Sequence, residues 1–147
     1  MRGNRTIAGF TLVEMIATMA IIALVASLVI AVTPGTGRVG LKAVTMNTAA
    51  LLRREREGAI LTRAERHVIL DGPHRIFIGE GGGAVAVPRD VAINLLGVAD
   101  PSAGRVSVAT FDPDGASSGA VLRLSREAAE YEIRVNWYTG GVSVKTD

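Results

Sequence analysis

The hexad Gly9-Phe10-Thr11-Leu12-Val13-Glu14 opens the most informative stretch of this chain, because the residues that follow it, Met15 to Val32, carry no charge. Residues 1–9, in front of it, contain two arginines and no acidic residue. A positively charged segment ahead of an apolar one is typical of a targeting signal. An ordinary secretory signal is cut after its apolar segment, whereas here the glycine comes before it. Cleavage at this glycine would therefore leave the apolar segment on the mature protein.

The apolar segment is long enough to cross a membrane. Phe10 to Thr33 would form a helix of about 36 Å at 1.5 Å per residue, and the hydrocarbon core of a bilayer is about 30 Å thick. Positive charge before the segment and a folded domain after it predict that the amino terminus stays in the cytoplasm. Pro34-Gly35-Thr36-Gly37 then predicts a break or bend in the helix.

Glu14 is the acidic residue at the mouth of this apolar segment. A charge near hydrocarbon costs up to about 3 kcal/mol on insertion scales, so it usually has a partner. The helix dipole also favours an acid in the first turn, but only by about 0.3–1 kcal/mol, which is too little to explain a carboxylate that faces lipid. We therefore expect the Glu14 carboxylate to be paired with a positive charge.

The hexad resembles the processing site of type IV pilin-like proteins. The resemblance implies that a prepilin peptidase cuts after Gly9 and that the new amino-terminal residue, Phe10, is N-methylated. It also implies that the retained helix assembles into a filament, in which Glu14 pairs with the amino terminus of a neighbouring subunit. The predicted organisation is a leader at residues 1–9, a transmembrane and assembly helix at 10–33, a hinge at 34–38 and a periplasmic globular domain at 39–147.

The composition limits the function classes. The chain has 16 Lys and Arg against 14 Asp and Glu, and Arg2 and Arg5 in the leader account for the whole excess of two. The remaining chain is therefore balanced in charge and has no broad attraction for nucleic acid. It has no cysteine, which excludes a disulfide and thiol chemistry.

A second helix is predicted from Val39 to Leu61. Its apolar stripe is interrupted by Glu55, and Gly58 weakens the helix or allows a strand to approach closely. The run from Arg53 to Glu57 alternates basic and acidic residues, so we interpret it as a solvated helix face with side-chain pairs rather than as a nucleic-acid site. The stripe consists of Leu41, Val44, Thr48, Leu51, Leu52, Glu55 and Ala59.

From Arg66 onward, the pattern changes to strands separated by turns. A hairpin is expected around Asp71-Gly72-Pro73-His74, and alternation is clearest from Tyr131 to Trp137, whose odd-numbered residues are expected to face the core. Residues 88–105 give no clear pattern. The expected strands are 68–70, 75–78, 84–87, 106–111, 121–124, 131–137 and 142–144. The predicted fold class is α+β, with a long N-terminal transmembrane helix followed by an amphipathic helix packed on an antiparallel β-sandwich-like domain.

The C-terminal half resembles a particular group within the pilin-like family. The turn Phe111-Asp112-Pro113-Asp114-Gly115 and the final segment Thr139-Gly140-Gly141-Val142 are similar to those of the minor pseudopilin H group, which overlaps the FimT-like minor pilins. This resemblance implies a β-sandwich domain on a long helix, at or near the tip of a short periplasmic pseudopilus.

The sequence offers no catalytic constellation. Asp112 and Asp114 are better explained as turn residues than as calcium ligands. His67 and His74 are expected at the surface, outside any zinc-ligand pattern. The glycines from Gly79 to Gly83 lack the strand–helix context and the lysine of a phosphate-binding loop, so a flexible hairpin loop is expected. No enzyme activity, cofactor or metal is predicted.

The leading hypothesis is a minor pseudopilin of a type II secretion system, a structural component that supports protein export across the outer membrane. Its expected partners are the other pseudopilins, the prepilin peptidase and the inner-membrane secretion platform. Its expected location is the bacterial inner membrane, crossed once, with the C-terminal domain in the periplasm. The alternative is a FimT-like minor pilin of a type IV pilus or DNA-uptake system, which would bind DNA through exposed arginines.

Overall fold

The computed structural model describes residues 12–32 and 38–146, and the side chains of residues 12–25 and 40–146. The chain divides into two compact units, Met1–Gly35 and Thr36–Asp147. The first contains the helix α1 (Leu12–Val32). The second contains the helix α2 (Arg38–Thr62) and eight strands. The predicted break at Pro34-Gly35-Thr36-Gly37 lies outside the described residues.

Helix α2 buries the stripe that its sequence pattern predicts. The seven stripe residues are all buried, and Leu41, Leu52, Glu55 and Ala59 are fully inaccessible to solvent. Two threonines within the helix, Thr45 and Thr48, are also fully buried. Each donates its hydroxyl to the carbonyl four residues earlier, at 2.8 Å, so neither leaves an unpaired polar group in the core.

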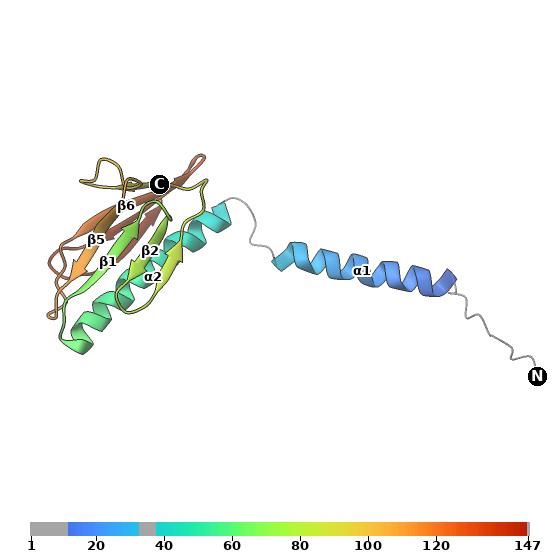
Figure 1. Ribbon diagram of the computed structural model, residues 1–147, viewed down its shortest axis with the longest axis horizontal. Helices are drawn as coiled ribbons and strands as arrows, with labels where there is room; N and C mark the ends of the chain where they lie inside the picture. Colours follow the sequence, from blue (N-terminus) through green and yellow to red (C-terminus); the bar gives the residue numbers. More distant parts are fainter. Residues whose placement is uncertain (1–11, 33–37, 147) are drawn as a thin grey trace, which may run out of the picture. The chain divides into compact units, whose positions relative to one another are not determined.

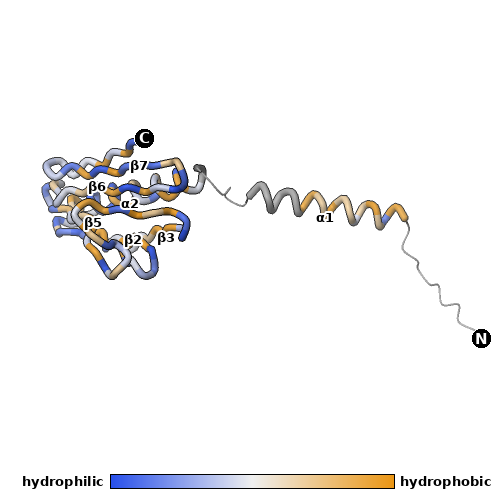
Figure 2. Tube along the Cα trace, turned by 90° about the horizontal axis from the view of Figure 1, so that it is seen from above, coloured by the Kyte–Doolittle hydropathy of each residue, from blue (hydrophilic) through white to orange (hydrophobic). Residues whose placement is uncertain are grey.

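The strands form two antiparallel sheets of four strands each, sheet A in the order β3-β2-β1-β5 and sheet B in the order β4-β6-β7-β8. Helix α2 contacts strands of both sheets, and Figure 2 shows it between the two sets of strands. Figure 1 shows the same elements from the side. The strands are β1 (Arg66–Asp71), β2 (Ile76–Gly79), β3 (Ala84–Ala86), β4 (Ala92–Leu95), β5 (Arg105–Phe111), β6 (Ala120–Arg126), β7 (Ala129–Val135) and β8 (Val142–Thr146).

One core joins the helix and both sheets. Phe77 and Phe111 of sheet A and Leu122, Leu124 and Ile133 of sheet B are each at most 1% exposed. The pairing of β1 with β5 shifts by one residue after Val68, so that Val108 and Ala109 are both buried. This β-bulge lets β5 contribute two successive side chains to the core.

The hairpin predicted around Asp71-Gly72-Pro73-His74 is confirmed, because β1 pairs antiparallel with β2 across it. Strand β4 lies within the segment that gave no clear pattern. It pairs with β6, a strand 25 or more residues further along the chain, with Ile93 opposite Leu124. Such a partner leaves no local signal in the sequence.

The prediction that Trp137 faces the core is wrong. Strand β7 ends at Val135, and Trp137 is 69% exposed. The side-chain oxygen of Asn136 accepts hydrogen bonds from the backbone N–H groups of Tyr138 and Thr139, at 2.9 and 3.0 Å. This turn ends the strand before its alternation can continue.

Candidate functional site

Of the three residues expected to carry processing and assembly, the structure describes only Glu14. Gly9 and Phe10 lie outside the described residues. Glu14 lies in the first turn of α1 and is exposed. One turn later, the hydroxyl of Thr18 donates to the carbonyl oxygens of Glu14 and Met15, at 3.0 and 2.9 Å. The hydroxyl is thus satisfied within the helix and adds no unpaired donor to this apolar surface.

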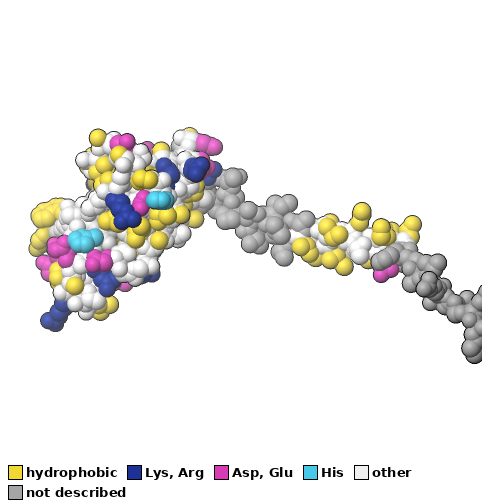
Figure 3. Space-filling model, in the orientation of Figure 1, with side chains coloured by type: hydrophobic (Ala, Val, Ile, Leu, Met, Phe, Trp, Pro, Cys, Tyr) yellow, Lys and Arg dark blue, Asp and Glu magenta, His cyan; other side chains and the backbone are white. Residues whose placement is uncertain are grey.

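From Leu12 to Val25, every side chain of α1 other than Glu14 and Thr18 is apolar. Every side chain from Leu12 to Val25 is exposed, and Figure 2 shows the hydrophobic character of this part of the helix. Figure 3 shows an acidic side chain at its N-terminal end. Within the described ranges, no helix combines the length and hydropathy required to cross a membrane. An apolar surface of this extent marks a site of contact with lipid or protein.

In the globular unit, the most unusual polar group is Glu55. Its side chain is fully buried, although it lies on the apolar stripe of α2. Its Oε2 accepts a hydrogen bond from the Gly81 N–H at 3.0 Å and lies 3.5 Å from Nη1 of Arg66, whose side chain is 24% exposed. The carboxylate therefore joins three segments, α2, the β2–β3 loop and the first residue of β1.

Glycines surround this carboxylate because larger residues would not fit. A Cβ added at Gly79 would lie 2.5 Å from Oε1 of Glu55, and one at Gly81 would lie 2.4 Å from Nη1 of Arg66. A Cβ at Gly58 would lie 2.6 Å from the same nitrogen. The loop from Gly79 to Gly83 is thus hydrogen-bonded to α2 at Gly81. The strand approach expected at Gly58 is made by the side chain of Arg66, the first residue of β1.

In the run from Arg53 to Glu57, Arg53, Arg54 and Glu57 are exposed, as predicted for a solvated helix face, but the arginines bind other partners than the predicted acids. Glu55 is buried, and three arginines donate to backbone carbonyls of loops and strands rather than to acids on the same helix. Arg53 donates to Val142 at 3.0 Å and Arg54 to Gly81 at 3.4 Å. Arg56 donates to Gly115 and Thr139 at 3.2 and 3.0 Å. These side chains hold loops to the helix, a role that the local charge pattern does not reveal.

A second charged cluster lies where the β1–β2 turn meets β5. Nδ1 of His74 lies 2.8 Å from Oδ1 of Asp71, and Nε of Arg105 donates to Oδ2 at 3.2 Å. The hydrogen bond with His74 lowers the pKa of Asp71 most; the His74 N–H and Arg105 also lower it, while burial opposes them. His74 and His67 are both exposed, as predicted.

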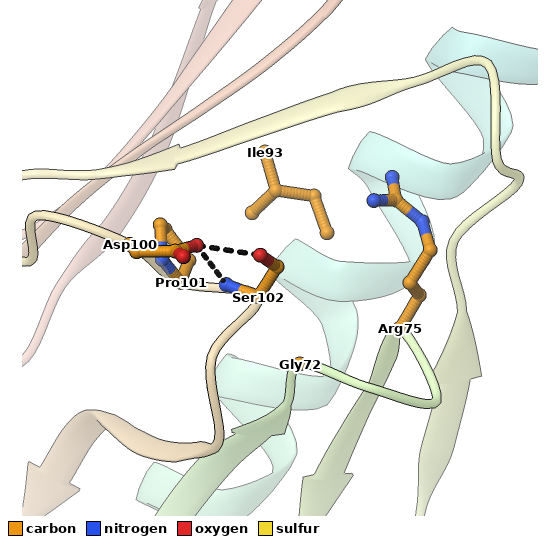
Figure 4. Close-up of a pocket in the computed structure, with 6 residues that line it drawn as sticks. All are labelled: Gly72, Arg75, Ile93, Asp100, Pro101 and Ser102. Carbon is orange, nitrogen blue, oxygen red and sulfur yellow. Dashed lines mark hydrogen bonds between the residues drawn. The ribbon is translucent and has the colours of Figure 1, made fainter.

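A cavity of about 120 Å³ lies beside this turn. Figure 4 shows the residues that line it. Asp100 accepts from both the N–H and the hydroxyl of Ser102, at 2.9 and 2.5 Å, and these bonds lower its pKa. Ile93 lies between this pair and Arg75, which donates to the carbonyls of Pro88 and Val91. Asp100 and Arg75 thus bind different partners, and both side chains hold loops in place.

The Asp112–Gly115 segment forms the predicted tight turn. The Gly115 N–H donates to the Asp112 carbonyl at 2.9 Å, and Oδ1 of Asp114 accepts from Ala116. Among the described residues, no cluster of three or more His, Asp or Glu side chains could hold a metal ion.

Comparison with known proteins assigns the chain to a family. Residues 4–30 match the prokaryotic N-terminal methylation motif. The chain is 30% identical to the type II secretion system protein H of Xanthomonas campestris pathovar campestris over 141 residues, which is 95% of this chain and 83% of the relative. The chain belongs to the family of type II secretion system protein H.

The fold agrees with this family. The minor pseudopilin EpsH from the type 2 secretion system of Vibrio cholerae matches 71% of this chain and 95% of its own, with a TM-score of 0.55 and 12% identity. This protein is thus a component of a type II secretion system, and it has the fold of a minor pseudopilin. The comparisons favour this interpretation over the FimT-like alternative. Sequence reasoning found the N-terminal motif but missed the role of Glu55, whose one signal was an acid on an apolar stripe.

Proposed function

We propose that this protein is made as a prepilin, cut after Gly9, N-methylated on Phe10 and assembled at or near the tip of a periplasmic pseudopilus. The observation that supports this proposal most directly is the methylation motif across residues 4–30, which includes both positions. Before assembly, the apolar segment would anchor the chain once in the inner membrane, with the globular unit in the periplasm. Its partners would be the prepilin peptidase, the inner-membrane platform and the other pseudopilins.

Glu14 has a specific part in this proposal. It would pair with the positive amino terminus that cleavage creates on a neighbouring subunit, and this pairing would set the register between adjacent helices. The position supports the idea, since Glu14 is exposed in the first turn of an otherwise apolar surface. Within a bilayer, an opposite charge would offset the cost of removing the carboxylate from water.

The processing step can be tested by intact mass. The full chain should be expressed with and without an active prepilin peptidase, together with a control substrate of that enzyme. The expected product lacks residues 1–9 and carries one added methyl group. An uncut chain beside a processed control substrate would show that the motif is not used.

The assembly step can be tested with Glu14→Ala, because removing the carboxylate should leave cleavage intact and impair secretion. Glu14→Asp is the matched control, since it keeps the charge on a shorter side chain. Secretion should be measured in cells that lack the wild-type copy, with the mature chain quantified in parallel. Normal secretion by Glu14→Ala would contradict the proposed pairing.

A further inference from the structure

The outer faces of the two sheets differ in chemistry. In sheet B, Leu122 and Ile133 are paired and buried, while the neighbouring pair, Arg123 and Glu132, faces away from the core. Arg123 and Arg134 both bind Glu132, at 3.0 and 2.8 Å, and these bonds lower the pKa of Glu132. Apolar side chains inside and charged ones outside are typical of an antiparallel sheet with one face in water.

Sheet A does not follow this pattern. Val68, Leu70 and Phe77 are fully buried, yet Ile69 and the two isoleucines on either side of Phe77 alternate with them, so the outer face is apolar in the middle of β1 and along β2. The polar residues on this face of β1, His67 and Asp71, lie toward the two ends of the strand. Ile69 lies opposite Ile78 on the neighbouring strand, and Ile78 lies opposite Ala84 on the next. Ile69, Ile76 and Ile78 are partly exposed and do not pack against the core. A strand that is apolar on both faces, as β2 is, is typical of a strand covered on both sides.

The apolar outer face of sheet A is also hollowed. A depression of about 250 Å³ is lined by His67, Ile69, Ile78, Gly79 and Glu80. Figure 3 shows one side of the domain on which hydrophobic side chains lie beside histidine and acidic ones. A depression with isoleucine walls can receive an aliphatic or aromatic side chain from another protein.

Charges are placed at the two ends of this face. At the end with the depression, Glu65 lies 3.6 Å from His67 and Glu80 accepts from the His67 N–H. This end carries two carboxylates. At the other end, Arg105, whose side chain is 70% exposed, lies with His74 around the nearly buried Asp71. A partner that fits this face would thus carry a cation near the depression.

A second copy of this chain fits the face poorly. If two copies met with their strands aligned, the acidic ends with Glu65 and Glu80 would lie over each other and repel. If they met with strands reversed, the apolar depression of one copy would face Arg105 and His74 of the other. Both two-fold arrangements leave a charged group against an unsuitable surface.

We propose that the outer face of sheet A docks the globular domain of a neighbouring, different pilin-like subunit. That subunit would insert an apolar side chain into the depression beside Ile69 and Ile78 and place a Lys or Arg next to Glu65 and Glu80. The proposal rests on the assignment of this protein to a pseudopilus, because assembly supplies such neighbours. It identifies which of the two sheets faces the next subunit.

The test is site-specific photo-crosslinking with the full chain, in cells that contain the rest of the secretion system and lack the wild-type copy. A benzoylphenylalanine would replace Ile69 or Ile78 on sheet A, and Arg123 or Ser143 as matched controls on the outer face of sheet B. Crosslinked products would be identified by mass spectrometry. The expected result is a product from each isoleucine position, and none from the control positions, with a protein that has its own N-terminal methylation motif.

Other outcomes would overturn the proposal. These are a product of two copies of this chain, a product with a protein that lacks the motif, or no product from sheet A. Secretion and the mass of the mature chain, measured in the same cells, separate the two levels of inference. A processed chain that restores secretion without crosslinking from sheet A would refute the docking face alone, whereas an unprocessed chain would refute the proposed function.

A charge placed in the depression gives a second readout. Ile78→Lys, combined with the crosslinker at Ile69, should reduce the crosslinked product about tenfold, because disrupting a central interface residue costs more than 1 kcal/mol. Ser143→Lys on sheet B, combined with the same crosslinker, should leave the yield unchanged. A thermal melt of each variant checks that the domain remains folded. Equal yields from folded Ile78→Lys and Ser143→Lys would contradict the proposal.

Discussion

The buried pair of Glu55 and Arg66 gives a sharp prediction about stability. Glu55→Gln and Arg66→Met each remove one charge while preserving most of the side-chain shape. We expect Arg66→Met to destabilise the domain more, although Arg66 is the more exposed residue. Arg66→Met leaves a carboxylate that is fully buried, whereas Glu55→Gln leaves an arginine whose side chain is 24% exposed.

The magnitudes follow from these environments. After Arg66→Met, the Glu55 carboxylate keeps the hydrogen bond from the Gly81 N–H but loses its cation. Leaving a buried charge without its counter-charge costs about 3–5 kcal/mol, and solvent access near residue 66 favours the lower end of this range. After Glu55→Gln, the amide oxygen can still accept from Gly81 and water can solvate Arg66. We expect a loss of about 1 kcal/mol, typical of one hydrogen bond.

Urea unfolding of residues 36–147 would measure both effects. This unit contains its own core, and the match to EpsH covers 71% of the chain and 95% of the solved EpsH chain. At a slope of about 1.5 kcal/mol/M, Arg66→Met should lower the midpoint by about 2 M and Glu55→Gln by less than 1 M. The double variant should be more stable than the sum of the single losses predicts, because neither charge is then left unpaired.

Arg123→Met is the control for this experiment, since it removes an exposed arginine on sheet B while Arg134 still pairs with Glu132, and it should shift the midpoint little. If Arg66→Met proved no more destabilising than Glu55→Gln, the buried carboxylate would have another counter-charge or access to water, and the reasoning would be refuted.

Two further predictions concern the same domain. Because the folded-state pKa of Asp71 is lowered, the unfolded chain takes up a proton there first as the pH falls below about 5, so this group loses its stabilising effect in acid. The free energy of unfolding, measured with urea between pH 6 and 3, should thus fall less for Asp71→Asn than for wild type or the surface control Glu127→Gln. Equal slopes of this free energy against pH would contradict the prediction. Gly79→Ala should destabilise the domain by about 1–3 kcal/mol, because its Cβ would lie 2.5 Å from Glu55. Gly104→Ala is the control, because its Cβ would meet no atom within 4 Å, and a thermal melt should show little change. Similar melting temperatures for these two variants would show that the loop can move away from Glu55.

Local patterns predicted the elements whose signals are local. The stripe from Leu41 to Ala59 identified α2 and its buried face, because a helix repeats every 3.6 residues along one segment. The β1–β2 hairpin followed from the turn at Asp71-Gly72-Pro73-His74. The same reasoning failed at Trp137, because the Asn136 side chain accepts a hydrogen bond from the Tyr138 N–H in the turn that ends the strand. At this position, the hydrogen-bonded turn rather than the alternating pattern decides where the strand ends.

The sequence by itself determined the family and the helix-then-sheet order of this protein, because the motif at residues 4–30 and the apolar stripe are continuous in the chain. Only the tertiary structure decided which charged residues are buried, where β4 pairs, and which sheet carries an apolar outer face. These properties depend on residues far apart in sequence, as when Glu55 meets Gly81 or Ile93 meets Leu124. The role of an acidic residue among apolar ones, such as Glu55, can be assigned only when the fold shows which groups contact its carboxylate.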